Sequence, residues 1–318
     1  MGKKKRKKRQ KEKKEEKKPR KNLKIVLAVL VFVLIGIYLF SASTGSSKWS
    51  LSEEGLIEYP QKRGKPVYAL TPVEEGEDYV LKKAVFESKG AEIYSLIFMP
   101  KSDEKGPGLV IAPGAGPTKE SRIEMARFLA DLGFASIILD QRTFGETGGT
   151  IANFQEDMAF MAQGIEPDQH KMVYDILVAY DVIKDQKEVD ASRVILIGES
   201  MGGRFSIIAG ALDSSIDGVI GISTGGYGTH TSQKTSLTPE QLKFLASVDP
   251  DSYISRISPR RVVMLHYDND EIIPLEVALN TYNQAKEPKK FHLLQGNGHG
   301  YYEEIDGYLE EELKNWDW

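Results

Sequence analysis

Short apolar runs and amphipathic runs take turns along the chain from residue 83 onward. The apolar runs contain few polar positions, which is typical of strands buried on both faces of a parallel sheet. The expected strands cover 83–88, 92–100, 106–113, 134–140, 193–198, 218–223, 261–266 and 289–296, and the expected helices cover 119–133, 168–186, 201–212, 274–286 and a segment from about 301. The first two strands alternate around a Lys-Gly turn and predict an antiparallel pair at one edge. The whole order predicts an α/β fold: a doubly wound, mostly parallel sheet with helices on both faces.

The N-terminus has a different pattern. From Ile25 to Phe40 no residue is charged for 16 positions, a length of about 24 Å as a helix. This is close to the thickness of a bilayer core and predicts a transmembrane anchor at residues 25–42. A signal peptide cleaved after Ser43 is the alternative, but its apolar region usually has only about 7–15 residues.

Charge sets the expected topology of this anchor. Residues 1–24 carry 15 Lys or Arg against three Glu, and because the net charge of the chain is -4, the remainder carries -16. A cationic flank stays in the cytoplasm, so we expect a basic cytoplasmic tail at 1–24 and a body outside the cytoplasm, secreted if cleavage occurs. The acidic body argues against nucleic acid as a partner. Residues 43–82 are expected to form a linker and N-terminal extension, and residues 83–318 the folded domain.

One motif lies at the carboxyl end of an expected strand, which is where such a sheet carries its reactive groups. Gly198-Glu199-Ser200-Met201-Gly202 follows an expected strand and precedes an expected helix, and it fits G-x-S-x-G. A serine on this turn projects its hydroxyl at the carboxyl edge of the sheet, so Ser200 is the candidate nucleophile. The chain has no cysteine, which excludes disulfides, thiolate metal sites and a cysteine nucleophile. The alternative is a glycine-rich turn with an idle serine.

A serine nucleophile needs a base, and the chain has five histidines. His299 lies in a loop between the last expected strand and the last helix, and it is the candidate base by position. His170 is expected on the surface of its helix, His292 inside a strand, His266 at a strand end and His230 in a polar loop.

The acid is expected after the strand at 261–266, between the serine and the histidine in chain order. Asp270 is preferred because it stands four residues before Pro274, where the next helix is expected. Asp268 is the alternative, and both could simply cap a turn. The oxyanion requires two backbone donors, for which we predict the amides of Met201 and Ala115, with Gly116 as the alternative to Ala115.

At this point roughly residues 83–316 resemble an α/β-hydrolase, in particular the branch of dienelactone hydrolase-like and prolyl-oligopeptidase-like serine hydrolases. The matching segments are PGAG, LDQRTFGETGG, GESMGG, DNDEIIP and GHG, in the family order. Two departures stand out: Pro113 replaces a common histidine, and Thr143-Phe144 replaces a small glycine. The chain has no room for a β-propeller before the domain, which weakens the oligopeptidase interpretation.

The resemblance implies a serine hydrolase that cleaves a small carboxylic ester through Ser200, His299 and Asp270, without a metal or organic cofactor. The uncharged run at 25–42 adds the expectation that this hydrolase is membrane-anchored. A peptidase, an acyltransferase and a catalytically silent binding domain are the alternatives. Residues 223–259 are expected to hold one small helix over the site. The apolar side chains of the segment after the LDQRTFGETGG turn either wall the substrate pocket or pack helices (Phe144, Phe154, Met158, Phe160 and Met161). No role is predicted for the side chain of Glu199, and the oligomeric state stays open.

Overall fold

The computed structural model describes residues 48–228, 237–316 and 318. The predicted basic tail, anchor and cleavage site all lie outside these residues. Within the described ranges, no helix is both long enough and apolar enough to cross a bilayer.

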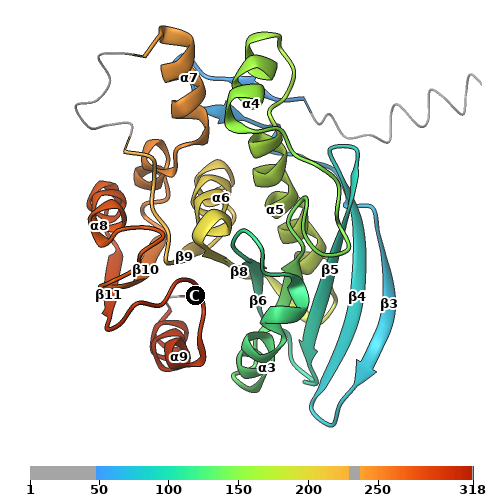
Figure 1. Cartoon of the computed structure of the whole chain (residues 1–318). Coiled ribbons are helices and arrows are strands. Elements are labelled where there is room, and N and C mark those ends of the chain that lie inside the picture. Colours follow the sequence, from blue (N-terminus) through green and yellow to red (C-terminus); the bar gives the residue numbers. More distant parts are fainter. Residues whose placement is uncertain (1–47, 229–236, 317) are drawn as a thin grey trace, which may run out of the picture. The chain divides into compact units, whose positions relative to one another are not determined.

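A nine-stranded sheet forms the centre of the described chain, in the order β11-β10-β9-β8-β6-β7-β5-β4-β3 (Figure 1). Its strands are β3 (Tyr68–Glu75), β4 (Tyr79–Ser88), β5 (Ala91–Pro100), β6 (Gly106–Ala112), β7 (Ala135–Leu139), β8 (Val189–Glu199), β9 (Gly218–Ile222), β10 (Arg261–Tyr267) and β11 (Lys289–Leu294). The neighbouring strands β11, β10, β9, β8, β6 and β7 pair in parallel, whereas β5, β4 and β3 pair antiparallel and form one edge. The predicted mostly parallel α/β sheet with an antiparallel edge is confirmed.

Helices cover both faces of this sheet. The described helices are α3 (Ile123–Asp131), α4 (Phe154–Ala162), α5 (Asp168–Lys184), α6 (Ser200–Leu212), α7 (Pro239–Val248), α8 (Leu275–Gln284) and α9 (Asp306–Lys314), with short 3-10 turns at η1 (Lys119–Arg122), η3 (Pro250–Ser252), η4 (Ile254–Arg256) and η5 (Glu303–Ile305). Helices α5, α6 and α8 share one apolar core with the sheet, and α3 and α9 share the other. Successive residues of β6 and β8 enter opposite cores, which is why these strands read as unbroken apolar runs.

The domain begins earlier than the predicted boundary at residue 83. Strand β3 and the first residues of β4 belong to the same sheet. Seven of the eight residues of β3 are exposed, so the strand lacks an alternating pattern. Its Pro72 lies at a register shift beside β4, where an edge strand tolerates a residue without an N–H.

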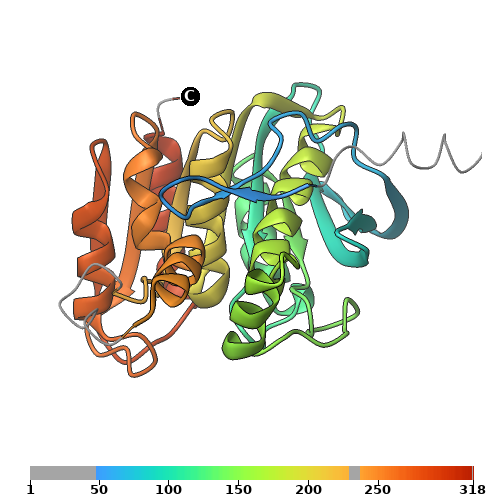
Figure 2. The ribbon, with the colours of Figure 1, turned by 90° about the horizontal axis from the view of Figure 1, so that it is seen from above.

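The stretch predicted as a linker also contains an ordered segment. Residues 48–63 include the two-stranded hairpin of β1 (Ser50–Leu51) and β2 (Ile57–Glu58), and we call them the strap. The strap crosses α5 and α6 (Figure 2). Tyr59 donates to the carbonyl of His170 at 2.8 Å, Gln61 donates to the carbonyl of Leu212 at 3.1 Å, and Arg63 pairs with Asp181 at 2.7 Å. The strap is therefore an integral part of the domain.

Candidate active site

Ser200 stands at the sharp turn between β8 and α6. Its φ is +48°, a left-handed conformation that is uncommon for a side chain with a Cβ. The flanking glycines are required by close packing: a Cβ on Gly202 would lie 2.2 Å from the carbonyl oxygen of Ala112, and one on Gly198 would lie 2.5 Å from the carbonyl oxygen of Gly202. Thr224 donates to the carbonyl of Ser200 at 2.7 Å and fixes the first turn of α6. The motif therefore supplies the strained geometry that exposes a serine hydroxyl.

The structure brings His299 and Asp270 to this serine. His299 Nε2 lies 2.9 Å from Ser200 Oγ, and His299 Nδ1 lies 2.8 Å from Asp270 Oδ2. The Asp270 side chain is fully buried, and its Oδ1 also accepts the backbone N–H groups of Ile272 and Ile273 at 2.9 Å each. These bonds fix the orientation of the carboxylate before it meets the imidazole.

Asp268, the alternative acid, has a different task. Its Oδ1 accepts the backbone N–H of Gly296 at 2.8 Å and the side-chain amide of Asn269 at 3.1 Å. It therefore holds the start of the histidine loop. Of the two carboxylates, the one in contact with His299 is Asp270.

The loop after β6 lies beside the nucleophile. A Cβ on Gly114 would lie 3.2 Å from Ser200 Cβ, so the backbone of this loop lies against Ser200 at Gly114. Ala115 is exposed one residue further along this loop, and Met201 begins the first turn of α6. Both predicted oxyanion donors thus belong to segments that border the serine hydroxyl.

An ion cluster around the buried Lys119 follows this loop. The Lys119 ammonium is fully buried and contacts carboxylates of Asp140 at 2.7 Å, Glu120 at 2.8 Å and Glu146 at 2.9 Å. These partners raise the pKa of Lys119 above its ordinary value, against the opposing effect of burial. Gln141 donates to the carbonyl of Pro113, so the departure from the common histidine leaves the loop with a side-chain support. Sequence reasoning missed both contacts.

The other departure keeps the backbone shape of a glycine. Thr143 has a φ of +76°, and its N–H donates to the carbonyl of Gly148 at 2.6 Å. The turn therefore imposes on Thr143 a conformation that glycine adopts without cost.

The other described histidines make no hydrogen bond to Ser200 or Asp270, although His266 Nε2 lies 3.7 Å from Asp270 Oδ2. His266 is buried, with Nε2 at 2.8 Å from the carbonyl of Ile273, and His292 Nε2 lies 2.7 Å from Glu312. His170, expected on the surface, is fully buried, and its Nε2 lies 2.8 Å from Ser247 Oγ on α7. Helix α7 and Trp49 of the strap cover it. Burial lowers the pKa of His170 to about 3. His230 lies outside the described residues.

The expected small helix in 223–259 is α7, and it packs against α4. Phe154 meets Phe244 with ring centroids 4.9 Å apart, and Met161 Sδ lies 3.9 Å from Ser247 Oγ. Helix packing accounts for these two of the proposed wall residues. Phe144, Met158 and Phe160 are half-buried.

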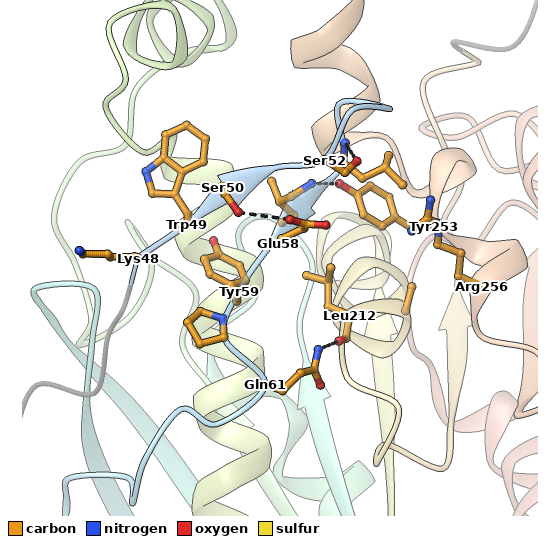
Figure 3. A pocket seen from close by; sticks show the side chains of 14 residues that line it. Lys48, Trp49, Ser50, Ser52, Glu58, Tyr59, Gln61, Leu212, Tyr253 and Arg256 are labelled. Carbon is orange, nitrogen blue, oxygen red and sulfur yellow. Dashed lines mark hydrogen bonds between the residues drawn. The ribbon is translucent and has the colours of Figure 1, made fainter.

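A cavity of about 660 Å³ lies beside the strap (Figure 3), and no triad residue lines it. Strap residues line it together with Ala211 and Leu212 at the far end of α6, and Tyr253 and Arg256 near η4. Its polar groups bind one another: Gln61 donates to Leu212, and Tyr253 Oη accepts the N–H of Ile57 at 2.7 Å. The Ser200 hydroxyl, at the opposite end of α6, does not line this space.

Comparison with known proteins identifies the family. Residues 65–224, half of the chain, match the family model described as acetyl xylan esterase (AXE1). YfhR of Escherichia coli K12 is 24% identical over 194 residues, which cover 60% of this chain and 62% of YfhR. Acetyl esterase Axe7A of Xylanibacter ruminicola is 23% identical over 244 residues, which cover 70% of this chain and 55% of that protein.

The fold agrees with this match. The solved acetyl xylan esterase of Paenibacillus sp. R4 superimposes with a TM-score of 0.68 at 19% identity, covering 80% of this chain and 90% of that one. The predicted resemblance to α/β-hydrolases is confirmed at the level of fold and family. The chain belongs to the acetyl xylan esterase (AXE1) family of α/β-hydrolases.

Proposed function

We propose that the protein hydrolyses carboxylic esters through an acyl-enzyme on Ser200. The hydrogen-bonded series Asp270–His299–Ser200 at the carboxyl edge of the sheet carries this proposal. Family membership supports a serine carboxylic ester hydrolase. Because the family model and Axe7A are named for acetyl esters, short acyl groups, acetyl first among them, are the substrate class we propose.

In the proposed first step, Ser200 Oγ attacks the ester carbonyl while His299 Nε2 takes the hydroxyl proton. The imidazolium then forms beside the buried Asp270 carboxylate, which holds the proton on Nδ1 and stabilises the positive charge. His299 next gives the proton to the leaving alcohol. A water molecule, deprotonated by His299, attacks the acyl-enzyme and releases the acid and free Ser200.

The negative charge of both tetrahedral intermediates needs donors fixed in advance. We assign this role to the amides of Met201 and Ala115, with Gly116 as the alternative second donor. The N-terminus of α6 adds its positive dipole end at the same place.

A substrate panel tests the reaction class. We expect p-nitrophenyl acetate to be cleaved by the wild type and not by Ser200→Ala, and cleavage of peptide p-nitroanilides to be far slower. Faster amide than ester cleavage would make the protein a peptidase, and acyl transfer to an added alcohol in preference to water would make it an acyltransferase. Absence of all three reactions would favour a silent binding domain.

We also propose that residues 25–42 anchor the enzyme in the cytoplasmic membrane, with the hydrolase domain outside the cytoplasm. The uncharged run and the basic residues before it support this topology. Mass spectrometry of the mature N-terminus tests it. An intact N-terminus in the membrane fraction agrees with an anchor, whereas a chain that begins at Thr44 would show a cleaved signal peptide.

A further inference from the structure

Glu199, the residue before the nucleophile, is a buried carboxylate that the proposed chemistry does not use. Its residue is only 1% exposed. A lone buried carboxylate is costly, so a charged partner is required. Arg122 of η1 supplies it: Arg122 Nε lies 2.6 Å from Glu199 Oε1, and Nη2 lies 2.7 Å from Oε2. This two-bond geometry fixes both side chains.

The same carboxylate also binds the histidine loop. Glu199 Oε2 accepts the backbone N–H of Tyr301 at 3.0 Å, two residues after His299. Between them, Gly300 has a φ of +84°, and a Cβ there would lie 2.9 Å from Glu199 Oε2. The loop therefore approaches the carboxylate through a glycine. The guanidinium of Arg122 lies 5.9 Å from the centre of the Tyr301 ring.

The loop that carries His299 is thus held by three carboxylates. Asp268 binds its start at Gly296, Asp270 binds the imidazole, and Glu199 binds its end at Tyr301. Two of these carboxylates follow β10, but Glu199 is the last residue of β8, directly before the nucleophile. The Tyr301 bond therefore ties the base to the same backbone turn as Ser200.

We propose that Glu199 and Arg122 are positioning residues of the active site: Glu199 sets the place of His299 relative to Ser200, and Arg122 orients the Glu199 carboxylate. This inference rests on the proposed ester hydrolysis for its kinetic consequences. Its geometry does not depend on the identity of the ester. A base moved by about 1 Å can lose about 100-fold in rate, so the expected effect is on kcat.

The pair also balances charge beside the loop that carries His299. The ionisable groups that surround His299 and its loop are Asp270 and His266 on and after β10, Asp268 at the loop start, Glu199 on β8, Arg122 on η1, and Tyr301 with Asp306 behind it. Glu199→Gln keeps an acceptor for Tyr301 but leaves the Arg122 cation unbalanced, which disfavours the imidazolium. Arg122→Gln leaves the Glu199 carboxylate unbalanced and favours the imidazolium. The two variants therefore shift the pKa of His299 in opposite directions.

The experiment compares wild type, Glu199→Gln, Arg122→Gln and the double variant. We expect kcat on p-nitrophenyl acetate to fall about 10–100-fold in each single variant, with KM within about 3-fold. The acidic limb of kcat/KM should move about 0.5–1 pH unit down in Glu199→Gln and up by a similar amount in Arg122→Gln. It should return toward the wild-type position in the double variant. Arg122→Lys, which keeps the charge but loses the two-bond fork, should lower kcat without moving the limb.

Glu312→Gln is the matched control. Glu312 of α9 is equally buried, and it pairs with Arg261 of β10 and His292 of β11. We expect it to lower stability and leave the pH profile in place. An NMR titration of the His299 ring in the same proteins measures the opposite shifts whether or not esters are cleaved. Unmoved or parallel shifts of the two single variants would overturn the inference. If the wild type cleaves no ester but the two single variants still shift the His299 titration in opposite directions, the inference is upheld and the proposed function is rejected.

Discussion

Replacement of Asp270 by Asn separates the role of its charge and hydrogen bond from the shape of the site. Asp270 Oδ1 accepts two backbone N–H groups, from Ile272 and Ile273, so the carbonyl oxygen of an Asn must take this position. The amide NH₂ then takes the place of Oδ2, which lies 2.8 Å from His299 Nδ1. His299 Nδ1 also lies 3.0 Å from Oδ1, but the NH₂ group at the closer position is a donor, which favours the tautomer with the ring proton on Nε2. A protonated Nε2 in the neutral ring cannot take the proton of Ser200.

The size of the loss follows from two effects. A charge pair about 4 Å apart is worth about 4 kcal/mol at an effective dielectric constant of about 20, and the imidazolium loses this stabilisation. The unfavourable tautomer adds to the loss. Together they predict a fall in kcat of about 10³–10⁴-fold, or about 4–5.5 kcal/mol, with little change in KM.

The assay is steady-state hydrolysis of p-nitrophenyl acetate, with Asp268→Asn as the matched control. Asp268 contacts Gly296 and Asn269, so its replacement should cost less than about 10-fold. A larger loss in Asp268→Asn than in Asp270→Asn would refute the assignment of the acid.

Two further predictions concern stability. Burial lowers the pKa of His170 to about 3, so the contribution of neutral His170 to the free energy of unfolding is fully present above about pH 6.5 and is lost as pH falls toward 3. Between pH 7.5 and 5, the free energy of unfolding measured in urea should fall by about 2 kcal/mol more in the wild type than in His170→Gln. Parallel losses in the two proteins would contradict this. Thr143→Gly should raise the free energy of unfolding by about 0.5–1 kcal/mol because Thr143 has a φ of +76°, whereas Thr118→Gly, at a φ of -98°, should lower it. Equal destabilisation by both glycines would show that Thr143 is not strained.

The sequence predicts those parts of the fold that bury apolar surface in a regular pattern. The central strands contribute alternate residues to two cores, so their apolar runs identify them, and the strand–turn–helix around Ser200 follows directly. Strand β3 lacks such a pattern because most of its side chains face solvent. The burial of His170 depends on the strap and α7, both distant from it in the sequence, and its own helix gives no sign of either.

The sequence likewise predicts some residues of the candidate site and not others. Ser200, Asp270 and His299 each follow a strand, so topology alone predicts that they meet at one edge of the sheet. The partner of Glu199 cannot be found in this way, because Arg122 lies 77 positions earlier in a short 3-10 turn. A charged residue at the end of an apolar strand does predict that some partner exists, since a buried carboxylate requires one.

Labelling with a fluorophosphonate probe tests the central claim most directly. The reagent modifies a serine only when a base and an oxyanion site activate it, and the modified peptide can be identified by mass spectrometry. We predict stoichiometric labelling of the wild type on Ser200 and none in Ser200→Ala. An unlabelled wild type, or a label that persists in Ser200→Ala, would contradict the claim that Ser200 is an activated nucleophile.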